Sequence, residues 1–255
     1  MKIEISAFQR EELSEALILE MENLVQEIDP SLSSDHLRKN HLPLPETTFY
    51  LARKGKNLVG IASYRTAWLQ ATENRKKVLV NVGGLFYRKK DPNLKQLVAT
   101  ICRLHIRKAL GPFWMLKPFM AIGHTVNPKV YTSLERSFPC FYPRTQSPTP
   151  LKIRKLLQDF YQQLYNKDFD ICPNLSLAEP ESYASETKIS QTYQEAYRSR
   201  NEKVNQFFFD QGVFKKAKNE LFLTNRSIIV MGYYSPKVLF KQILGKQVIM
   251  PALNT

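Results

Sequence analysis

The sequence predicts an α/β protein of the α+β kind, built on a mixed β-sheet. Three observations support this fold class. Segments with strand-like and helix-like spacing of apolar residues alternate through residues 1–143. Two consecutive strands are joined by a short link that contains glycine, which is typical of a β-hairpin. Farther along, a strand is followed by a capped helix and then by another strand, an order that allows those two strands to be parallel.

The first 69 residues predict one strand, two helices and the hairpin. Alternation of apolar residues over 2–8 indicates a short strand, and leucine and isoleucine recur at helical spacing over 9–28. A serine–aspartate pair begins a shorter helix over 35–42. The segments 47–53 and 57–69 are rich in aromatic and β-branched residues and form the two strands of the hairpin.

The next part of the chain predicts a strand, a helix, a second strand and a second helix. The first strand covers 77–87 and extends the hairpin into an antiparallel meander. An Asp-Pro pair opens the helix 92–110, and a glycine follows its last residue. The strand 113–125 contains a proline, which indicates an edge strand or a bulge. Asn127 caps the second helix, whose buried stripe is expected to be Val130, Tyr131, Leu134 and Phe138.

We expect residues 1–145 to form one domain and residues 146–255 a C-terminal α/β extension that packs on it. Four prolines between 139 and 150 mark the connection. The apolar faces of the extension are too small for a separate stable core. Its elements are predicted at 150–165, 187–210 and 238–244 as helices and at 220–234 as one strand or two.

Charge is unevenly distributed along this basic chain of 255 residues. The net charge is +14, with a balance of −6 over residues 1–50, +17 over 51–160 and +3 over 161–255. The basic middle section attracts polyanions, namely a nucleotide cofactor, nucleic acid or an acidic membrane surface. A solvated basic face without a ligand is the other interpretation.

Composition also limits the cellular setting and the metal chemistry. No run approaches the roughly 18 apolar residues of a membrane span, and no apolar signal core is present, so we expect a cytoplasmic protein. The cysteines are odd in number and have no CxxC spacing, which favours buried thiols such as Cys102 over disulfides. His36 and His41 have no further ligand types nearby, so we expect no metal site.

Positively charged residues lie between the end of the strand 77–87 and the start of the helix 92–110. Arg88, Lys89 and Lys90 follow the strand, and the helix N-terminus adds free backbone amides. Such an arrangement binds anions, so it predicts a ligand that carries phosphate.

The predicted order, β-α-α-β-β-β-α-β-α, with this turn after the fourth strand, resembles the GNAT superfamily of acyl-CoA N-acyltransferases over residues 2–143. The resemblance implies acetyl-CoA or another acyl-CoA as cosubstrate and an amine as acceptor. The pantetheine arm would lie between the strands 77–87 and 113–125, with the pyrophosphate at the N-terminus of the next helix. The family turn is usually rich in glycine, whereas RKKDPNLKQL has none, so basic side chains would supply the charge here.

The resemblance also assigns roles to individual residues. Backbone amides of Leu85, Phe86 and Tyr87 would polarise the thioester carbonyl. Asn127 matches the asparagine that the family carries after its fifth strand. The remaining cofactor-binding residues would be Arg88, Lys89, Lys90 and Asn93.

His124 and Tyr131 are the candidate catalytic residues. His124 ends the strand 113–125, where a neutral imidazole would act as general base for the amine. Tyr131 lies one turn before the usual place of the family's general-acid tyrosine, a place that Leu134 holds here. Each residue also has a structural interpretation, as a hydrogen-bonded histidine and as a core tyrosine.

The predicted function is therefore a GNAT-like N-acyltransferase that acts on an unidentified amine of a small molecule or a protein. The alternative is a non-catalytic GNAT-fold protein that binds a partner or nucleic acid through its basic middle section. Aromatic residues beside basic ones, as in Tyr64-Arg65, would suit single-stranded nucleic acid, and they fit a strand core equally.

Overall fold

A computed structural model gives the fold as two compact units. Unit 1 consists of Met1–Thr66 and Leu79–Trp114, and unit 2 consists of Ala67–Val78 and Met115–Thr255. The structure describes residues 3–28, 32, 34–44, 46–69, 76–87, 97–165, 172, 174–178, 187–189, 197–218 and 220–243.

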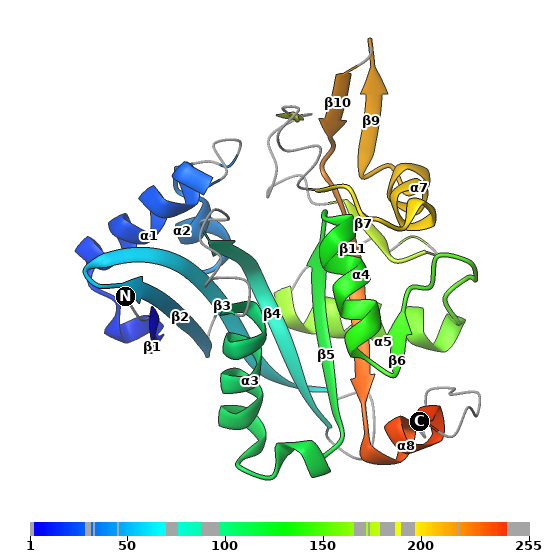
Figure 1. The fold of residues 1–255 in the computed structure, drawn as a ribbon, viewed down its shortest axis with the longest axis horizontal. Coiled ribbons are helices and arrows are strands. Elements are labelled where there is room, and N and C mark those ends of the chain that lie inside the picture. Colours follow the sequence, from blue (N-terminus) through cyan, green and yellow to red (C-terminus); the bar gives the residue numbers. More distant parts are fainter. Residues whose placement is uncertain are drawn as a thin grey trace. The chain divides into compact units, whose positions relative to one another are not determined.

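The elements of the first half of the chain follow the predicted order (Figure 1). They are β1 (Ile3–Gln9), the 3-10 helix η1 (Arg10–Glu12), α1 (Glu15–Ile28), α2 (His36–Asn40), β2 (Thr47–Lys54), β3 (Asn57–Leu69), β4 (Lys76–Tyr87), α3 (Leu97–Leu110), the 3-10 helix η3 (Trp114–Leu116), β5 (Phe119–Thr125) and α4 (Pro128–Ser137). This order confirms the mixed α/β class and the succession of elements that the sequence predicted. The predicted start of α3 at residue 92 lies outside the described residues.

The strands of unit 1 stand in the order β1-β2-β3-β4. β1 pairs with β2 and β2 pairs with β3, in both cases antiparallel, and Thr47 of β2 lies opposite Arg65 of β3. Gly55 turns the hairpin at a φ of 62°, a left-handed conformation that glycine adopts without a Cβ clash. The predicted hairpin is confirmed.

The two faces of this sheet are covered by different helices, because successive strand residues point to opposite sides. Tyr64 faces α3, since its hydroxyl lies 2.9 Å from Cys102 Sγ. Ser63 faces α2, since its Oγ lies 3.3 Å from His41 Nδ1. The α3 side carries an apolar cluster of Tyr50, Ala52, Val59, Ala62, Tyr64, Leu97 and Ile101.

Unit 2 is organised around its longest strand, β11 (Arg226–Tyr234). β11 pairs antiparallel with β5 from Ile228 opposite Thr125 to Tyr234 opposite Phe119. It also pairs with the short strands β6 and β7. The remaining elements of the unit are β6 (Cys140–Tyr142), α5 (Leu151–Tyr165), β7 (Ser176–Ala178), β8 (Thr187–Lys188), α7 (Glu202–Asp210), β9 (Phe214–Ala217), β10 (Glu220–Leu223) and α8 (Pro236–Ile243).

Several boundaries differ from the sequence-based expectation, among them the helix predicted from residue 9, which begins at Glu15 after β1 and η1. The strand predicted from residue 113 begins at Phe119, because Pro118 has no N–H for the ladder, and η3 precedes it. Of the two alternatives for 220–234, the structure has two strands, which lie in different sheets, since β10 pairs with β8 and β9. A helix starting at residue 187 is wrong, because Thr187–Lys188 forms β8 and the helix α7 starts at Glu202.

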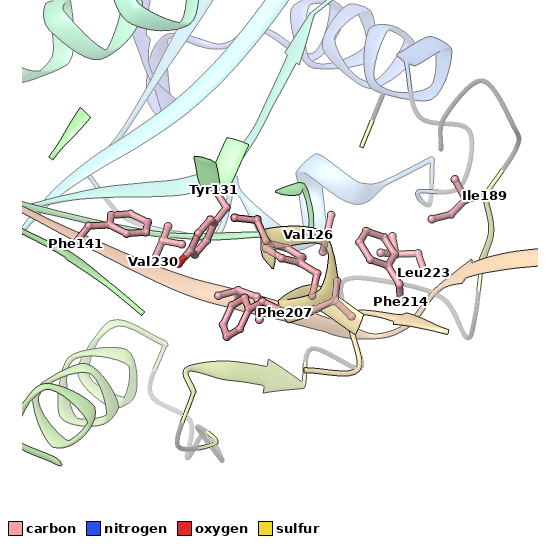
Figure 2. Close-up of a cluster of buried hydrophobic side chains, with 12 residues drawn as sticks. Val126, Tyr131, Phe141, Ile189, Phe207, Phe214, Leu223 and Val230 are labelled. Atoms are coloured by element: carbon pink, nitrogen blue, oxygen red, sulfur yellow. The ribbon is translucent and has the colours of Figure 1, made fainter. Parts of the chain in front are cut away.

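The most deeply buried side chain that helix α4 contributes to its packing is a tyrosine. Tyr131 is completely buried, whereas Val130 is 44 % exposed, so the predicted buried stripe is wrong at Val130. Tyr131 belongs to an apolar cluster that joins α4, β11, β6 and α7 (Figure 2). Its members include Val126, Phe141, Val204, Phe207, Phe208, Phe214, Ile228 and Val230. Burial of this cluster, rather than helix propensity, holds α4 and α7 in place.

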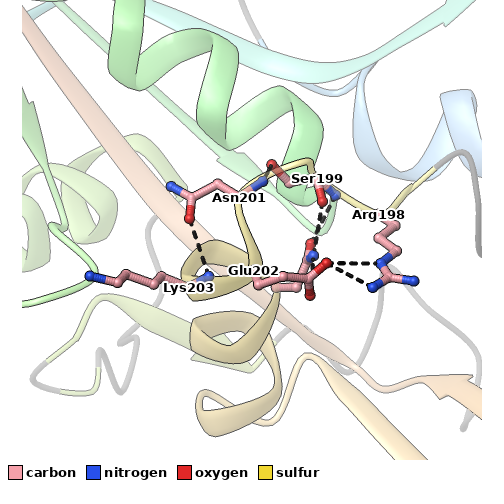
Figure 3. A network of polar contacts seen from close by, with 6 residues as sticks. Arg198, Ser199, Asn201, Glu202 and Lys203 are labelled. Carbon is pink, nitrogen blue, oxygen red and sulfur yellow. Dashed lines mark hydrogen bonds and ion pairs between the residues drawn. The ribbon is translucent and has the colours of Figure 1, made fainter.

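A polar network begins helix α7 and ties it to α4 (Figure 3). Asn201 Oδ1 accepts the N–H of Lys203 at 3.2 Å, which caps the helix. The N–H of Ser199 donates to Asn205 Oδ1 at 2.8 Å. The hydroxyl of the buried Ser199 lies 2.9 Å from the hydroxyl of Thr132 on α4. The junction of the two helices is therefore both apolar and hydrogen-bonded.

The division into domains at residue 145 stays a prediction. What the structure adds is that β11, from the predicted extension, hydrogen-bonds along the whole of β5, from the predicted first domain. Among the helices of the described residues, none is long and apolar enough to cross a membrane.

Gly232 of β11 generates the first testable prediction. A Cβ at this position would lie 2.3 Å from Phe138 Cγ, far inside van der Waals contact. We expect Gly232→Ala to lower the free energy of unfolding by about 1–3 kcal/mol in urea denaturation, because the ring must move. In the double variant with Phe138→Ala the second change should remove the clash, so the losses should be less than additive. Strictly additive losses would show that the ring is not what opposes the methyl group.

Candidate functional site

The junction between β5 and α4 carries three of the predicted site residues. Asn127 Oδ1 accepts the N–H of Lys129 at 2.9 Å and that of Val130 at 3.4 Å, so Asn127 caps α4 as predicted. Its own N–H donates to Thr125 Oγ1 at 3.0 Å. These local bonds fix the direction in which the chain leaves the strand. A contact between Asn127 and a cofactor stays a prediction.

His124 points to the face of the sheet away from α4. Gly232, which packs against Phe138 at the end of α4, lies directly opposite Ala121 of β5. Ala121 therefore faces α4, and by alternation His124, three residues farther along, faces the other side. Ile229, the residue opposite His124, is completely buried, so this second face is also covered there.

Tyr131 is committed to the core on the α4 side. Its hydroxyl donates to the carbonyl oxygen of Pro143 at 2.6 Å. Its ring contacts Phe141, Phe207 and Phe208. Burial raises the pKa of Tyr131, as does the nearby Glu135, while Arg144 opposes the shift. The geometry supports the core interpretation of Tyr131, and the structure does not bring Tyr131 and His124 to one side of the sheet.

Apart from Asn127, the predicted cofactor-binding residues fall at and beyond the end of β4. The last three residues of that strand are Leu85, Phe86 and Tyr87, so their backbone amides lie at its C-terminal end. The other four lie outside the described residues: Arg88, Lys89, Lys90 and Asn93. Their roles stay predictions.

A cluster of titratable side chains lies between α3 and the hairpin of unit 1. His105 is 3 % exposed, with Nδ1 3.2 Å from the Tyr50 hydroxyl and Nε2 3.4 Å from Thr66 Oγ1. The ring of Tyr64 stacks on it at 5.1 Å. Burial lowers the pKa of His105 to about 4, helped by Lys108, and burial raises the pKa of Tyr50 to about 12. At neutral pH the imidazole and the phenol are therefore both uncharged.

A second polar cluster lies on the opposite face of the same sheet. His41 Nε2 is 3.2 Å from His36 Nε2, and His41 Nδ1 is 3.3 Å from Ser63 Oγ, with all three residues buried. The sequence reasoning set the two histidines aside as a metal pair and missed the serine, which is 22 residues away. Within the described ranges, no three histidine, cysteine or acidic residues are grouped to hold a metal ion.

No protein-family model matches the chain, and no curated protein matches it. Among solved structures, an acyl-CoA N-acyltransferase from Pseudomonas aeruginosa is similar at 9 % identity and a TM-score of 0.39, covering 58 % of this chain and 92 % of its own.

Two further structures are similar over most of the chain. An IAA acetyltransferase from Bacillus cereus has 11 % identity and a TM-score of 0.36, and covers 91 % of this chain and 100 % of its own. A GNAT family acetyltransferase from Elizabethkingia anophelis, with acetyl-CoA bound, has 11 % identity and a TM-score of 0.34, and covers 91 % and 98 %. For residues 3–137, the order of elements that the sequence predicted is the order that the structure has.

The buried His105 generates a prediction of pH-dependent stability. Its pKa in the folded protein, about 4, lies below the ordinary value of 6.5, so the unfolded chain takes up a proton first as the pH falls. The stability that His105 contributes is therefore complete above pH 6.5 and is lost as the pH falls toward 4. Between pH 7.5 and 5 we expect a loss of about 2 kcal/mol in the free energy of unfolding from this residue.

Urea denaturation at a series of pH values measures this loss. The variant His105→Gln has no imidazole to titrate, so its stability should fall less steeply than that of the unaltered protein over the same range. Parallel curves for the two proteins would mean that His105 is protonated as readily when folded as when unfolded.

Proposed function

We propose that the chain is a GNAT-like N-acyltransferase that moves an acetyl or other acyl group from CoA to an amine. The observation that carries the proposal is the succession of elements, in which β4 precedes α3 and β5 ends in a helix capped by Asn127. The basic residues 88–90 after β4 add charge suited to the phosphates of CoA. In this proposal the protein is cytoplasmic and uses no metal.

The proposed chemistry is direct aminolysis of a thioester. The amine nitrogen forms a bond to the thioester carbon, the carbon–sulfur bond breaks, and the amine gives up one proton while the CoA thiolate gains one. Amides at Leu85 to Tyr87 would hold the developing oxyanion. His124 is the described residue proposed to accept the proton of the amine. Because the hydroxyl of Tyr131 already donates a hydrogen bond to the carbonyl oxygen of Pro143, we assign protonation of the thiolate to water.

The burial of Tyr131 favours a second candidate function. A GNAT-fold protein without an exposed acid at this position would bind a partner or nucleic acid through the basic section 51–160 without catalysis. Neutral aromatic residues beside basic ones, as in Tyr64-Arg65, are consistent with either candidate. The two candidates differ in whether acyl-CoA binds and whether an acyl group is transferred.

Affinity for acetyl-CoA is the first test, measured by calorimetry. If the side chains of Arg88 and Lys89 replace the missing glycines of the turn, the double variant Arg88→Ala, Lys89→Ala should bind acetyl-CoA more weakly. The difference should be larger at low salt, because ionic contacts are screened by salt. The absence of binding to the unaltered protein, combined with tight salt-dependent binding of single-stranded nucleic acid, would favour the second candidate.

Transfer kinetics test the role of His124. We expect His124→Ala to lower the rate of acyl transfer by roughly 10²-fold or more while leaving acetyl-CoA affinity nearly unchanged. Tyr131→Phe is the matched comparison, because it removes a hydroxyl that the core already uses. It should lower stability by about 1–2 kcal/mol, through the unpaired Pro143 carbonyl, with little effect on the transfer rate. An unchanged rate in His124→Ala would remove His124 from the mechanism.

A further inference from the structure

Arg65, near the end of β3, has two buried guanidinium nitrogens without a hydrogen-bond partner among the described residues. Its Nε and Nη1 atoms are buried, and neither makes a hydrogen bond in the part of the chain that the structure describes. The residue as a whole is only partly buried, so solvent reaches some of it. An arginine guanidinium stays protonated at any physiological pH, so the positive charge is permanent.

Arg53 on the neighbouring strand β2 is the natural comparison. Its Nη1 donates to Glu20 Oε1 at 2.9 Å and to the carbonyl oxygen of Lys56 at 2.8 Å, and its Nη2 contacts Glu20 Oε2. The same sheet thus holds one arginine paired with a carboxylate and one whose buried Nε and Nη1 make no hydrogen bond within the described residues.

Successive side chains of β3 point to opposite faces of the sheet, and this alternation gives the face to which the Arg65 side chain points. Arg65 and Ser63 are two residues apart, so they share the face of the sheet that α2 covers near His41. Thr47 lies directly opposite Arg65 in β2, and its hydroxyl donates to the carbonyl oxygen of Leu44 at 2.8 Å. Ser63 along β3 and Thr47 across in β2 thus offer hydroxyl groups on this face, and neither supplies negative charge.

A buried cation without a counter-charge is unfavourable, because its lost hydration is not replaced. Buried polar donors in folded proteins are almost always paired, so an exception calls for a physical reason. One general reason is a binding site, where a ligand brings the missing acceptors and the empty protein bears the cost.

We propose that Arg65 binds an anionic oxygen group, the carboxylate or phosphate of a small ligand, inside unit 1. Both groups accept charge-assisted hydrogen bonds from a guanidinium, and the partial exposure of Arg65 gives a small ligand access. Arg65 is not among the residues proposed to contact acyl-CoA. The test of this site uses no CoA, so the two proposals succeed or fail independently.

Thermal unfolding in different salts of equal ionic strength tests the site. For the unaltered protein we expect a midpoint about 2 °C or more higher in sodium acetate or sodium phosphate than in sodium chloride. The salt that gives the larger rise identifies carboxylate or phosphate as the preferred group. Arg65→Met should abolish the rise, and Arg53→Met should retain it. A rise that persists in Arg65→Met is a general salt effect and overturns the proposal, as does the absence of a rise in the unaltered protein.

The stability in chloride alone provides a second readout. Arg65→Met replaces unpaired donors with an apolar side chain of similar length, so its midpoint should be higher than that of the unaltered protein. Arg53→Met leaves Glu20 without its partner, so its midpoint should be lower. If Arg65→Met unfolds at a lower midpoint, Arg65 is structural and the proposal is overturned. Arg65→Lys keeps the charge without the planar fork. It should fold and show a reduced acetate or phosphate shift, which keeps the proposal testable if the methionine variant does not fold.

Discussion

The antiparallel ladder between β11 and β5 is the interaction on which unit 2 depends. It runs the full length of β5, and β6 and β7 attach to β11 rather than to β5. The apolar cluster around Tyr131 takes residues from both strands of this ladder. Val126 directly follows β5, and Ile228 and Val230 belong to β11. Main-chain hydrogen bonds and side-chain burial thus reinforce one another across a long separation in sequence.

The same ladder determines which chemistry the junction of β5 and α4 offers. Its register assigns Ala121 to the side of α4, where Gly232 admits the ring of Phe138, and it assigns His124 to the other side. Tyr131 then fills the apolar space under α4 and gives its hydroxyl to a main-chain carbonyl. The catalytic role of His124 stays a proposal.

Local signals in the sequence predicted most of the fold. Asn127 and Pro128 predicted the start of α4, and the glycine of the hairpin predicted a turn that Gly55 makes with a positive φ. Apolar spacing could not separate Val130 from Tyr131, because the two lie four and three residues before Leu134 and both fit a helical stripe with it. The polar clusters were beyond local reasoning altogether, since Tyr50 and His105 are 55 residues apart and only the folded sheet brings them together.

The position of β11 in the chain has a consequence for the order of folding during synthesis. About one hundred residues separate the end of β5 at Thr125 from the start of β11 at Arg226. At ribosomal rates of roughly 5–20 residues per second, the edge of β5 waits for its partner for about 5–20 seconds. Through that interval β5 presents unpaired main-chain donors and acceptors, a surface that pairs readily with other chains. The hairpin of unit 1 has no such delay, because both of its strands leave the ribosome together.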